Sequence, residues 1–339
     1  MRALLVAAVL LAPSAIDAQS RSVTPASGAC VPCHAREVAA WSTTAHALAW
    51  RDRVFLAAYR EEPMAFCRGC HAPRSDPSRE PDETARAEGV SCAQCHARAT
   101  EHLATRGIAR ADTATPDAIR CGRCHQFGFP VDRGEGRALW HTPNPMQNTV
   151  REWARSDAKG RGDDCVGCHF TDDHGLDGVG ERAFLASAVR VRVAATRSRG
   201  VWSVVAEVRP ASVGHAFPTG DLYRSGRLVV WVEGGASRER VFARRFEEVA
   251  LVEEGGAGVF ARRERYDGRV SPPGDDDADT VMLTVPARGG APLRWRFEHW
   301  RTTPAIAARQ GLRDDEVRTV LHEGSVSASD ERPAAETRR

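Results

Sequence analysis

The sequence predicts an α+β protein, with a mainly helical, loop-rich N-terminal region followed by a C-terminal antiparallel β-sandwich. All ten cysteines of the 339-residue chain lie between Cys30 and Cys168. Apolar residues in the early part of this region recur at helical spacing. From about residue 183 the cysteines stop, and apolar and polar residues alternate, as they do in half-buried strands. A chain of this length is expected to form two domains with separate cores.

Composition excludes several classes of protein. The 47 Lys+Arg and 45 Asp+Glu residues nearly balance, at a formal net charge of +2. Nucleic acid is therefore not expected as the main partner, because neutralising phosphates requires a clear basic excess. A hydrophobic content of 42% with 27% charged residues excludes wholesale disorder.

The first residues predict export. A single positive charge at Arg2 precedes a ten-residue apolar run, and small residues lead to Ala18. This pattern predicts a signal peptide over residues 1–18, with an uncleaved anchor as the alternative. The run is too short to span a bilayer, which takes about 20 residues. The mature chain is therefore expected to be periplasmic or otherwise exported, without a transmembrane segment.

Every cysteine belongs to a Cys-x-x-Cys-His motif. The five copies are Cys30/Cys33/His34, Cys67/Cys70/His71, Cys92/Cys95/His96, Cys121/Cys124/His125 and Cys165/Cys168/His169. Two thiols at this spacing bond the vinyl groups of a heme, and the adjacent histidine binds the iron on the proximal side. Structural disulfides and four-cysteine zinc sites are the alternatives, but neither needs a histidine after every pair. The motifs therefore predict five covalently bound heme c groups.

The hemes themselves are expected to form much of the N-terminal core. Five motifs fall within residues 30–169, which leaves about 28 residues for each, too few for a conventional core around every heme. We therefore predict a pentaheme cytochrome c domain over residues 19–182, with closely packed hemes.

Histidines outside the motifs are candidates for the distal face of each iron. The candidate distal ligands are His46, His102, His141, His174 and His215. His46 lies on a helix predicted over about residues 36–59, and an ordinary surface histidine is its alternative. His174 follows the fifth motif after only four residues, too short a loop to return to its own heme, so a neighbouring heme is expected.

Other side chains are weaker candidates. The thioether of Met146, near His141, is an alternative ligand, although methionine more often serves packing. His299 shares the apolar face of a predicted strand, where a satisfied core histidine is expected. His322 has no predicted role.

The first motif with Trp41 and His46, and the run from Gly89 through the third motif to His102, resemble the tetraheme cytochrome that accepts electrons from hydroxylamine oxidoreductase. The similarity is to proteins with a cytochrome c-552/4 domain, in a superfamily that includes hydroxylamine oxidoreductase and pentaheme nitrite reductases. It extends over about residues 28–230, including the Gly-His-Ala-Phe-Pro-Thr-Gly loop at 214–220. The resemblance implies that His102 ligates the first heme, His46 the third and His215 a later one.

The sequence also departs from these relatives. Ammonia-forming nitrite reductases usually attach the catalytic heme at Cys-x-x-Cys-Lys, whereas every motif here ends in histidine. Hydroxylamine oxidoreductases carry eight hemes and a cross-linked tyrosine, and this chain has five motifs and three tyrosines. The tetraheme cytochrome has one five-coordinate heme, so an open iron stays possible. Ala158 stands where the spacing from Trp153 would repeat that of Trp41 and His46.

The C-terminal region is predicted to form the β-sandwich over residues 183–323, with six to eight strands. The predicted strands cover residues 189–193, 201–208, 227–232, 241–251, 281–285 and 293–300. The acidic run Asp275-Asp276-Asp277-Ala278-Asp279 lacks the spacing of a calcium loop, so calcium is not expected. Residues 324–339 are polar and are predicted to be a disordered tail.

These features predict an exported pentaheme cytochrome that transfers electrons along a chain of hemes. The alternative is a heme redox enzyme with one open iron, acting on hydroxylamine, NO or nitrite. The sequence names no convincing proton donor for such an enzyme, so electron transfer is the preferred interpretation. Redox partner proteins are expected, but the sequence does not identify the donor or the acceptor.

Overall fold

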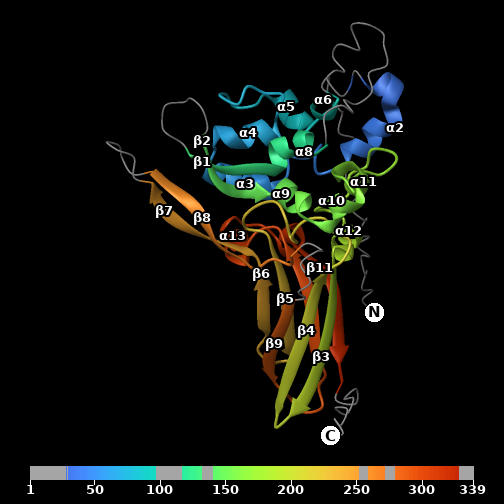
Figure 1. The fold of residues 1–339 in the computed structure, drawn as a ribbon, viewed down its shortest axis with the longest axis vertical. Coiled ribbons are helices and arrows are strands. Elements are labelled where there is room, and N and C mark those ends of the chain that lie inside the picture. The colour runs from blue at the N-terminus through green and yellow to red at the C-terminus, as the bar shows by residue number, and fades with distance from the viewer. Residues whose placement is uncertain are drawn as a thin grey trace, which may run out of the picture.

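The computed structural model describes residues 28, 30–96, 117–131, 140–251, 259–271 and 279–327 of the chain. A head of short helices lies at one end of an elongated pair of β-sheets (Figure 1). The predicted α+β class, helical first and antiparallel second, is confirmed. The predicted signal peptide, His102 and most of the acidic run at 275–279 lie outside the described residues.

The helices of the head are short, and each heme motif lies on one of them. Their bounds are α2 Val31–Ser42, α3 Arg53–Glu61, α4 Ala65–His71, α5 Glu83–Glu88, α6 Cys92–Cys95, α8 Asp117–His125, α9 Thr149–Ala154, α10 Asp157–Arg161, α11 Cys165–His169 and α12 Arg182–Ser187. Side-chain caps fix several starts. Asp52 accepts from Phe55 N at the start of α3, and Asp164 accepts from Gly167 N at the start of α11. A helical turn brings both cysteines and the histidine of a motif to one place in the head.

The single helix predicted over residues 36–59 is wrong. Helix α2 ends at Ser42, a segment of turns carries His46, and α3 begins at Arg53. The hydroxyls of Ser42 and Thr43 donate to backbone carbonyls three residues earlier, 2.7 and 3.0 Å away. Such hydroxyl bonds compete with helix continuation, and the apolar spacing does not reveal them.

A two-stranded antiparallel hairpin that the sequence did not predict completes the head. Strands β1 (Gln126–Val131) and β2 (Trp140–Asn148) pair directly after the fourth motif. Gly128 and Pro130 within β1 weaken a strand pattern, which explains why it was missed. The side chain of Phe127 meets Phe66 edge-on at 4.9 Å, which ties the hairpin to α4.

The C-terminal region forms the predicted antiparallel sandwich. Its strands are β3 Val189–Ser198, β4 Val201–Pro210, β5 Ser225–Val232, β6 Arg238–Phe242, β9 Asp279–Pro286, β10 Leu293–Trp300 and β11 Arg318–Val326. One sheet has the order β11-β10-β5-β6 and the other β3-β4-β9. Alternate side chains such as Trp202, Leu228 and Phe297 are fully buried between the sheets. Burial of this apolar layer is the main stabilising term for the sandwich.

Three details of the predicted strands need correction. The run at 241–251 is divided at residue 243 into the end of β6 and a separate strand, β7 (Arg244–Leu251). Strand β7 pairs with β8 (Val259–Asp267), which the sequence did not predict. Strand β11 runs to Val326, so the sandwich continues past its predicted end at residue 323.

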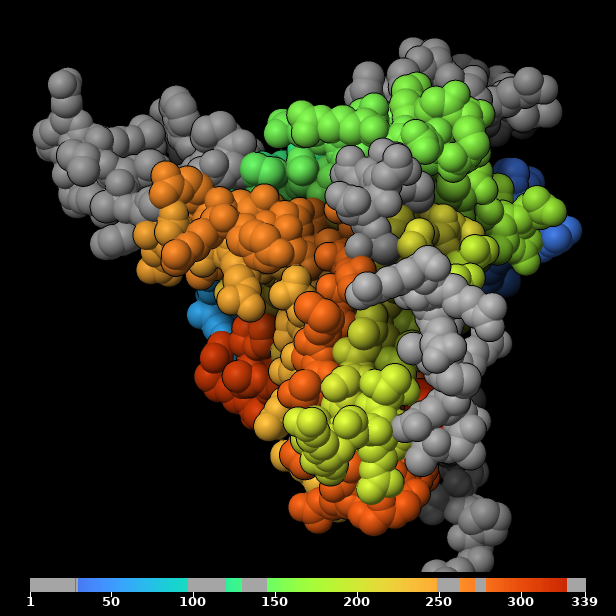
Figure 2. Space-filling view, turned by 60° about the horizontal axis from the view of Figure 1, so that its bottom comes forward, coloured from blue at the N-terminus to red at the C-terminus, as the bar shows by residue number. Residues whose placement is uncertain are grey.

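The β7–β8 hairpin leaves the sandwich and lies along the β1–β2 hairpin of the head (Figures 1 and 2). Phe129 of β1 and Phe246 of β7 meet edge-on at 5.2 Å. The hairpin therefore joins the two regions through aromatic packing.

A second junction lies between α3 and the segment after β10. Helices α13 (Pro304–Arg309) and α14 (Asp314–Val317) follow that strand. Val54 of α3 packs against a cluster that contains Trp300 and Val317. Arg301 pairs with Asp52 at 2.8 Å beside this cluster. Among the described residues, no helix combines the length and apolarity needed to cross a bilayer.

Candidate heme sites

Three motif histidines lie opposite a second histidine ring. His125 of the fourth motif lies 6.3 Å from His46, between ring centroids. His96 of the third motif lies 6.3 Å from His174. The rings of the third pair, His169 of the fifth motif and His215, lie 6.2 Å apart and are nearly parallel, at 8°.

These separations fit one metal ion between each pair of rings. Imidazole nitrogens bind such ions at about 2 Å, and each nitrogen lies about 1 Å from its ring centre, so two opposed rings have centroids about 6 Å apart. Direct stacking would bring the rings closer, to about 4 Å. The three pairs therefore have the spacing of proximal and distal ligands of an iron.

Backbone carbonyls set the tautomer of two motif histidines. The Nδ1 atom of His71 lies 2.7 Å from the carbonyl oxygen of Ala49, and that of His169 lies 3.0 Å from Asp177 O. A carbonyl oxygen only accepts, so each Nδ1 carries the proton and each Nε2 keeps a free lone pair for iron. The residues present therefore fit heme c, with the cysteine pairs as attachment points.

The surroundings favour neutral imidazoles, the form that binds iron. Although His125 keeps an accessible surface, the dense protein around it desolvates its ring and lowers its pKa to about 4, with nearby His46 and Arg224 adding to the shift. Desolvation likewise lowers the pKa of His215 to about 4.

Cysteines of different motifs meet in the head. The thiols of Cys30 and Cys92, from the first and third motifs, form a side-chain hydrogen bond. Cys70 and Cys124, from the second and fourth motifs, form another, which together with burial raises the pKa of Cys70. These contacts place the attachment points of the first and third hemes side by side, and likewise those of the second and fourth.

Two of the predicted attachment cysteines lie at the surface of the head. Cys33 of the first motif and Cys168 of the fifth are exposed, whereas the other eight cysteines are half-buried. Cys33 is exposed because α2 lies at the edge of the head, where its neighbours Val31 and His34 are exposed too (Figure 1). Both cysteines keep the spacing of one helical turn from their partners, which is what attachment requires, so they stay predicted attachment points.

The backbone that carries His46 rests directly on the segment before the third motif. The indole nitrogen of Trp41 donates to Val90 O at 3.0 Å, and Val90 N donates to His46 O at 2.9 Å. Gly89 has φ +54°, and a Cβ there would lie 2.5 Å from the His46 carbonyl oxygen. Only glycine fits this close approach.

The same arrangement recurs before the fifth motif. Trp153 donates from its indole nitrogen to Asp163 O at 2.8 Å, and Asp163 N donates to Ala158 O at 3.0 Å. Val90 and Asp163 each stand two residues before the first cysteine of a motif. Ala158, at the position equivalent to His46, is buried and packs near Gly214. Its small side chain leaves space for the loop that carries His215.

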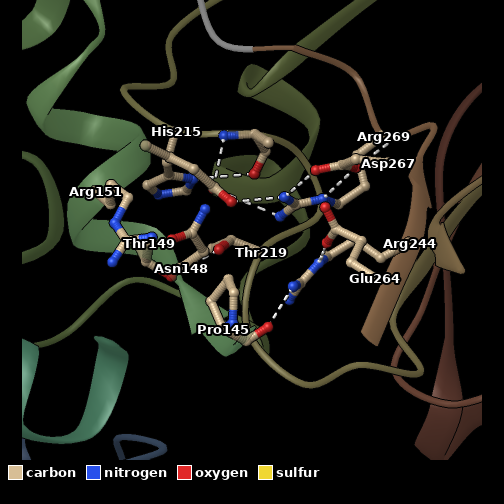
Figure 3. Close-up of polar contacts among 12 residues, drawn as sticks. Pro145, Asn148, Thr149, Arg151, His215, Thr219, Arg244, Glu264, Asp267 and Arg269 are labelled. Atoms are coloured by element: carbon tan, nitrogen blue, oxygen red, sulfur yellow. Dashed lines mark hydrogen bonds and ion pairs between the residues drawn. The ribbon is translucent and has the colours of Figure 1, made fainter. Parts of the chain in front are cut away.

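The 214–220 loop is held by a buried ion-pair network (Figure 3). Ala216 N donates to Glu152 Oε2 at 3.2 Å. The Arg269 guanidinium bonds Glu152 Oε1 at 2.6 Å and Asp267 Oδ1 at 2.9 Å. The side chains of Arg269 and Glu152 are 4% and 9% exposed. Thr219 adds a hydroxyl contact with Thr149 at 2.7 Å.

The second motif has a different environment. The His71 ring stacks on Phe55 at 3.6 Å between centroids. In the described part of the chain no histidine ring lies opposite it at the spacing of the three pairs. Arg224 lies close enough for its charge to act on both His71 and His125. It donates to Thr219 O at 2.9 Å.

The remaining predicted ligands are placed only in part. His34 of the first motif is exposed, 4.0 Å from Glu37. His102 lies outside the described residues. His141 lies in β2 opposite Pro130, but its side chain is outside the described part of the structure. The backbone carbonyl of Met146 accepts from Arg244 at 2.6 Å.

The structure revises three expectations about histidines. The resemblance implied that His46 serves the third heme, but its ring faces His125 of the fourth motif. His299 is buried as expected, yet its Nδ1 has no hydrogen-bond partner, so it is not a satisfied core histidine. His322 has a structural role, because its Nε2 lies 3.1 Å from Ala186 O and 3.0 Å from Val189 O.

Sequence reasoning missed Glu152, Arg269 and Arg224. Glu152 and Arg269 are 117 residues apart in the sequence, with Arg224 between them, and none of the three belongs to a motif. A glutamate beside Trp153 in the region of resemblance was the one available signal, and it gave no partner.

Comparison with known proteins agrees with this site. Residues 29–97 match the protein family described as cytochrome c554 and c-prime. The first part of the head is therefore similar to that family of multiheme cytochromes. A crystal structure of a penta-heme cytochrome c552 from Thermochromatium tepidum matches this chain with a TM-score of 0.61 at 18% identity, covering 88% of this chain and 98% of that chain. No curated protein sequence matches this chain.

These findings confirm the resemblance to multiheme cytochromes that the motifs indicated. At 18% identity the structural match shows a shared fold, and its coverage extends over both the head and the sandwich of this chain. The β-sandwich is therefore part of a known architecture and not an unrelated addition.

Proposed function

We propose that this protein is an exported pentaheme c-type cytochrome that carries electrons between redox partner proteins. The observation that carries the proposal is the set of three histidine pairs at 6.2–6.3 Å. Six-coordinate irons have no free position for substrate, so such sites suit electron transfer. Bound heme c supplies a reversible one-electron Fe(III)/Fe(II) couple.

The residues of the chain have distinct tasks in this function. The cysteine pairs attach the hemes, and His34, His71, His96, His125 and His169 are the proposed proximal ligands. His46, His174 and His215 are the proposed distal ligands of the fourth, third and fifth hemes. Because His102 and His141 are the remaining candidates, we assign them to the first two hemes. Carbonyls such as Ala49 O and Asp177 O fix ring orientation.

Close spacing of the attachment residues supports a continuous chain of hemes. Cys30 meets Cys92, and Cys70 meets Cys124, which link motifs one with three and two with four. His125 also lies within electrostatic range of His169 and His215, which links motifs four and five. The opposed rings of His96 and His174 link the third motif to the segment directly after the fifth, so the proposed chain joins all five motifs.

The heme content and the couple are tested on protein produced with cytochrome c maturation. Intact mass and pyridine hemochrome analysis should give five covalent hemes per chain, and cell fractionation should recover it outside the cytoplasm. A redox titration should be reversible and spread over several potentials. Fewer than five hemes, or free thiols in a motif such as that of the exposed Cys33, would refute the pentaheme proposal.

A heme enzyme with one open iron, acting on hydroxylamine, NO or nitrite, is the second candidate. The observation that favours it is the His71 site, which has no opposing histidine ring among the described residues. Low-temperature EPR and carbon monoxide binding to the reduced protein separate the candidates. Five low-spin irons that do not bind carbon monoxide support the electron carrier. One high-spin iron that binds it in the wild type supports the enzyme, and His215→Ala should then bind one further carbon monoxide per chain.

A further inference from the structure

The loop that carries His215 is fixed directly after the histidine, at residues 216–218, by groups from distant parts of the chain. Ala216 N donates to Glu152 Oε2 at 3.2 Å. Further along, Phe217 N donates to Val270 O at 2.9 Å, and Val270 N donates back to Phe217 O at 3.0 Å. Among the described residues, the imidazole of His215 makes one polar contact, between its Nδ1 and Ala216 O at 3.2 Å. Its direction therefore depends on how the loop is held.

Arg269 connects these restraints. Its guanidinium bonds Glu152 Oε1 at 2.6 Å, and it reaches Pro218 O at 3.4 Å, two residues beyond Ala216. The same guanidinium also donates to Asp267, from Nε to Oδ1 at 2.9 Å and from Nη2 to Oδ2 at 2.5 Å. Figure 3 shows Arg269 between Asp267 and the loop of His215. One side chain thus fixes both the carboxylate that binds residue 216 and the carbonyl of residue 218.

The pair is poorly explained by stability alone. Both side chains are almost fully buried, at 4% and 9% exposed. Burying two charges costs desolvation that their attraction only partly offsets, and apolar packing often stabilises such a site as well. A rigid, hydrogen-bonded pair instead gives a fixed geometry to the groups it binds, as the supporting residues of metal ligands do.

We propose that Glu152 and Arg269 form a positioning pair that holds His215 opposite His169 at the fifth heme. This inference rests on the proposed function, in which His215 is the distal ligand there. Glu152 supplies the acceptor for the loop, and Arg269 fixes the carboxylate in the one orientation that reaches Ala216 N. Neither residue binds the iron.

The experiment compares carbon monoxide binding to the reduced holoprotein in a set of variants with equal heme content. His215→Ala first defines the carbon monoxide phase of the fifth iron. Glu152→Ala should show that same phase with binding about tenfold faster than in the wild type, the effect of losing one charge-assisted hydrogen bond. Glu152→Gln, which retains an acceptor oxygen, should stay near the wild-type rate. A double variant of Glu152 and His215 should add nothing to His215→Ala.

Glu298→Ala is the matched control, because Glu298 is also a buried carboxylate, with side-chain exposure of 2%, paired with Arg296 and Arg318 in the sandwich. The Glu298→Ala variant should be less stable than the wild type but should not show the carbon monoxide phase of the fifth iron. If Glu152→Ala does not accumulate, Arg269→Gln replaces it. This variant should show the same carbon monoxide phase of the fifth iron.

The outcomes separate the inference from the proposed function. The positioning pair is refuted, and the proposed function stands, if His215→Ala shows the carbon monoxide phase but Glu152→Ala and Arg269→Gln bind carbon monoxide no faster than Glu298→Ala. If His215→Ala shows no new phase, the assignment of His215 and the inference both fail. Loss of hemes from the wild type would overturn both.

Discussion

At the scale of single residues, the position of His46 depends on Gly89, which has no side chain to contribute to the site. Gly89 has φ +54°, and an added Cβ would lie 2.5 Å from His46 O and 2.8 Å from Ala47 O. Real Cβ atoms do not approach carbonyl oxygens so closely, and left-handed backbone is itself costly for other residues. The glycine therefore permits the contact between the His46 turn and the segment before the third motif.

Gly89→Ala should destabilise the holoprotein by about 2–3 kcal/mol and weaken the low-spin signal of one iron, because the clash adds to the backbone cost. Gly162→Ala is the control, since Gly162 also has a positive φ, +86°, but an added Cβ meets nothing within 4 Å. It should cost only about 1 kcal/mol and leave the spectrum unchanged. Urea unfolding and EPR measure the two effects, and equal losses in both variants would contradict the clash.

Asp267 should give a pH-dependent contribution to stability. Burial raises its pKa, but bonding to Arg269 outweighs burial, so the folded-state pKa lies below the ordinary value. Ionised Asp267 therefore favours the folded state above the unfolded pKa of about 3.9, and this contribution is lost as pH falls through the folded-state pKa.

Thermal midpoints of the wild type and Asp267→Asn should thus differ at neutral pH and converge below about pH 4. Asp315→Asn, at an exposed aspartate that pairs with Arg313, should show little difference at any pH. A gap for Asp267→Asn that persists unchanged in acid would mean that its charge is not the cause.

At the scale of elements, the head contains one arrangement twice. A tryptophan indole bonds the carbonyl two residues before a motif, at 3.0 Å for Trp41 and 2.8 Å for Trp153. A hydroxyl bonds back to each tryptophan carbonyl, from Thr44 and from Ser156. The repeat supports two motifs in the same way, but only the first copy carries a histidine, His46. The second copy carries Ala158 and receives the His215 loop instead.

Replacing either tryptophan by phenylalanine removes the indole donor and leaves a carbonyl without its partner. Each of Trp41→Phe and Trp153→Phe should cost about 1 kcal/mol, a fall in thermal midpoint of about 1–2 °C for a chain of this size. The similar cost is the expectation from the repeat. An unchanged midpoint in one variant only would show that the two copies are not equivalent.

At the scale of the whole molecule, the sandwich supports the head at two junctions. The β7–β8 hairpin packs on β1 through Phe246 and Phe129, and α3 packs on the segment after β10 through Val54 and Trp300. The sandwich region also supplies His215, between β4 and β5, and Arg269, after β8, and these two segments pair through Phe217 and Val270. The fifth heme site is therefore completed by residues from both regions.

Head and sandwich should accordingly unfold together. Denaturation followed by the Soret absorbance of the hemes and by far-ultraviolet circular dichroism of the strands should give coincident transitions. Val54→Ala should lower both by the same amount, because Val54 belongs to a shared cluster. Two separated transitions would show that the junctions do not couple the regions.

Local patterns in the sequence predicted the fold class and the heme attachment points. Each of the five Cys-x-x-Cys-His motifs predicts heme attachment from residues that are neighbours in the sequence. Strict alternation, as in Val189, Val191 and Val193, predicts strands without knowledge of their partners. The helix over 36–59 was wrong because hydroxyl bonds of Ser42 and Thr43 end it, and β1 was missed because it contains Gly128 and Pro130.

Residue spacing alone therefore determined what this protein attaches, a set of hemes, since attachment needs only neighbours along the chain. Tertiary structure decided which histidine faces which motif. His46 with His125, and His174 with His96, are separated by 79 and 78 residues, and no local preference fixes such a pair. The same holds for Glu152 with Arg269, because a buried charge finds its partner through packing of the whole chain and not through its place in the sequence.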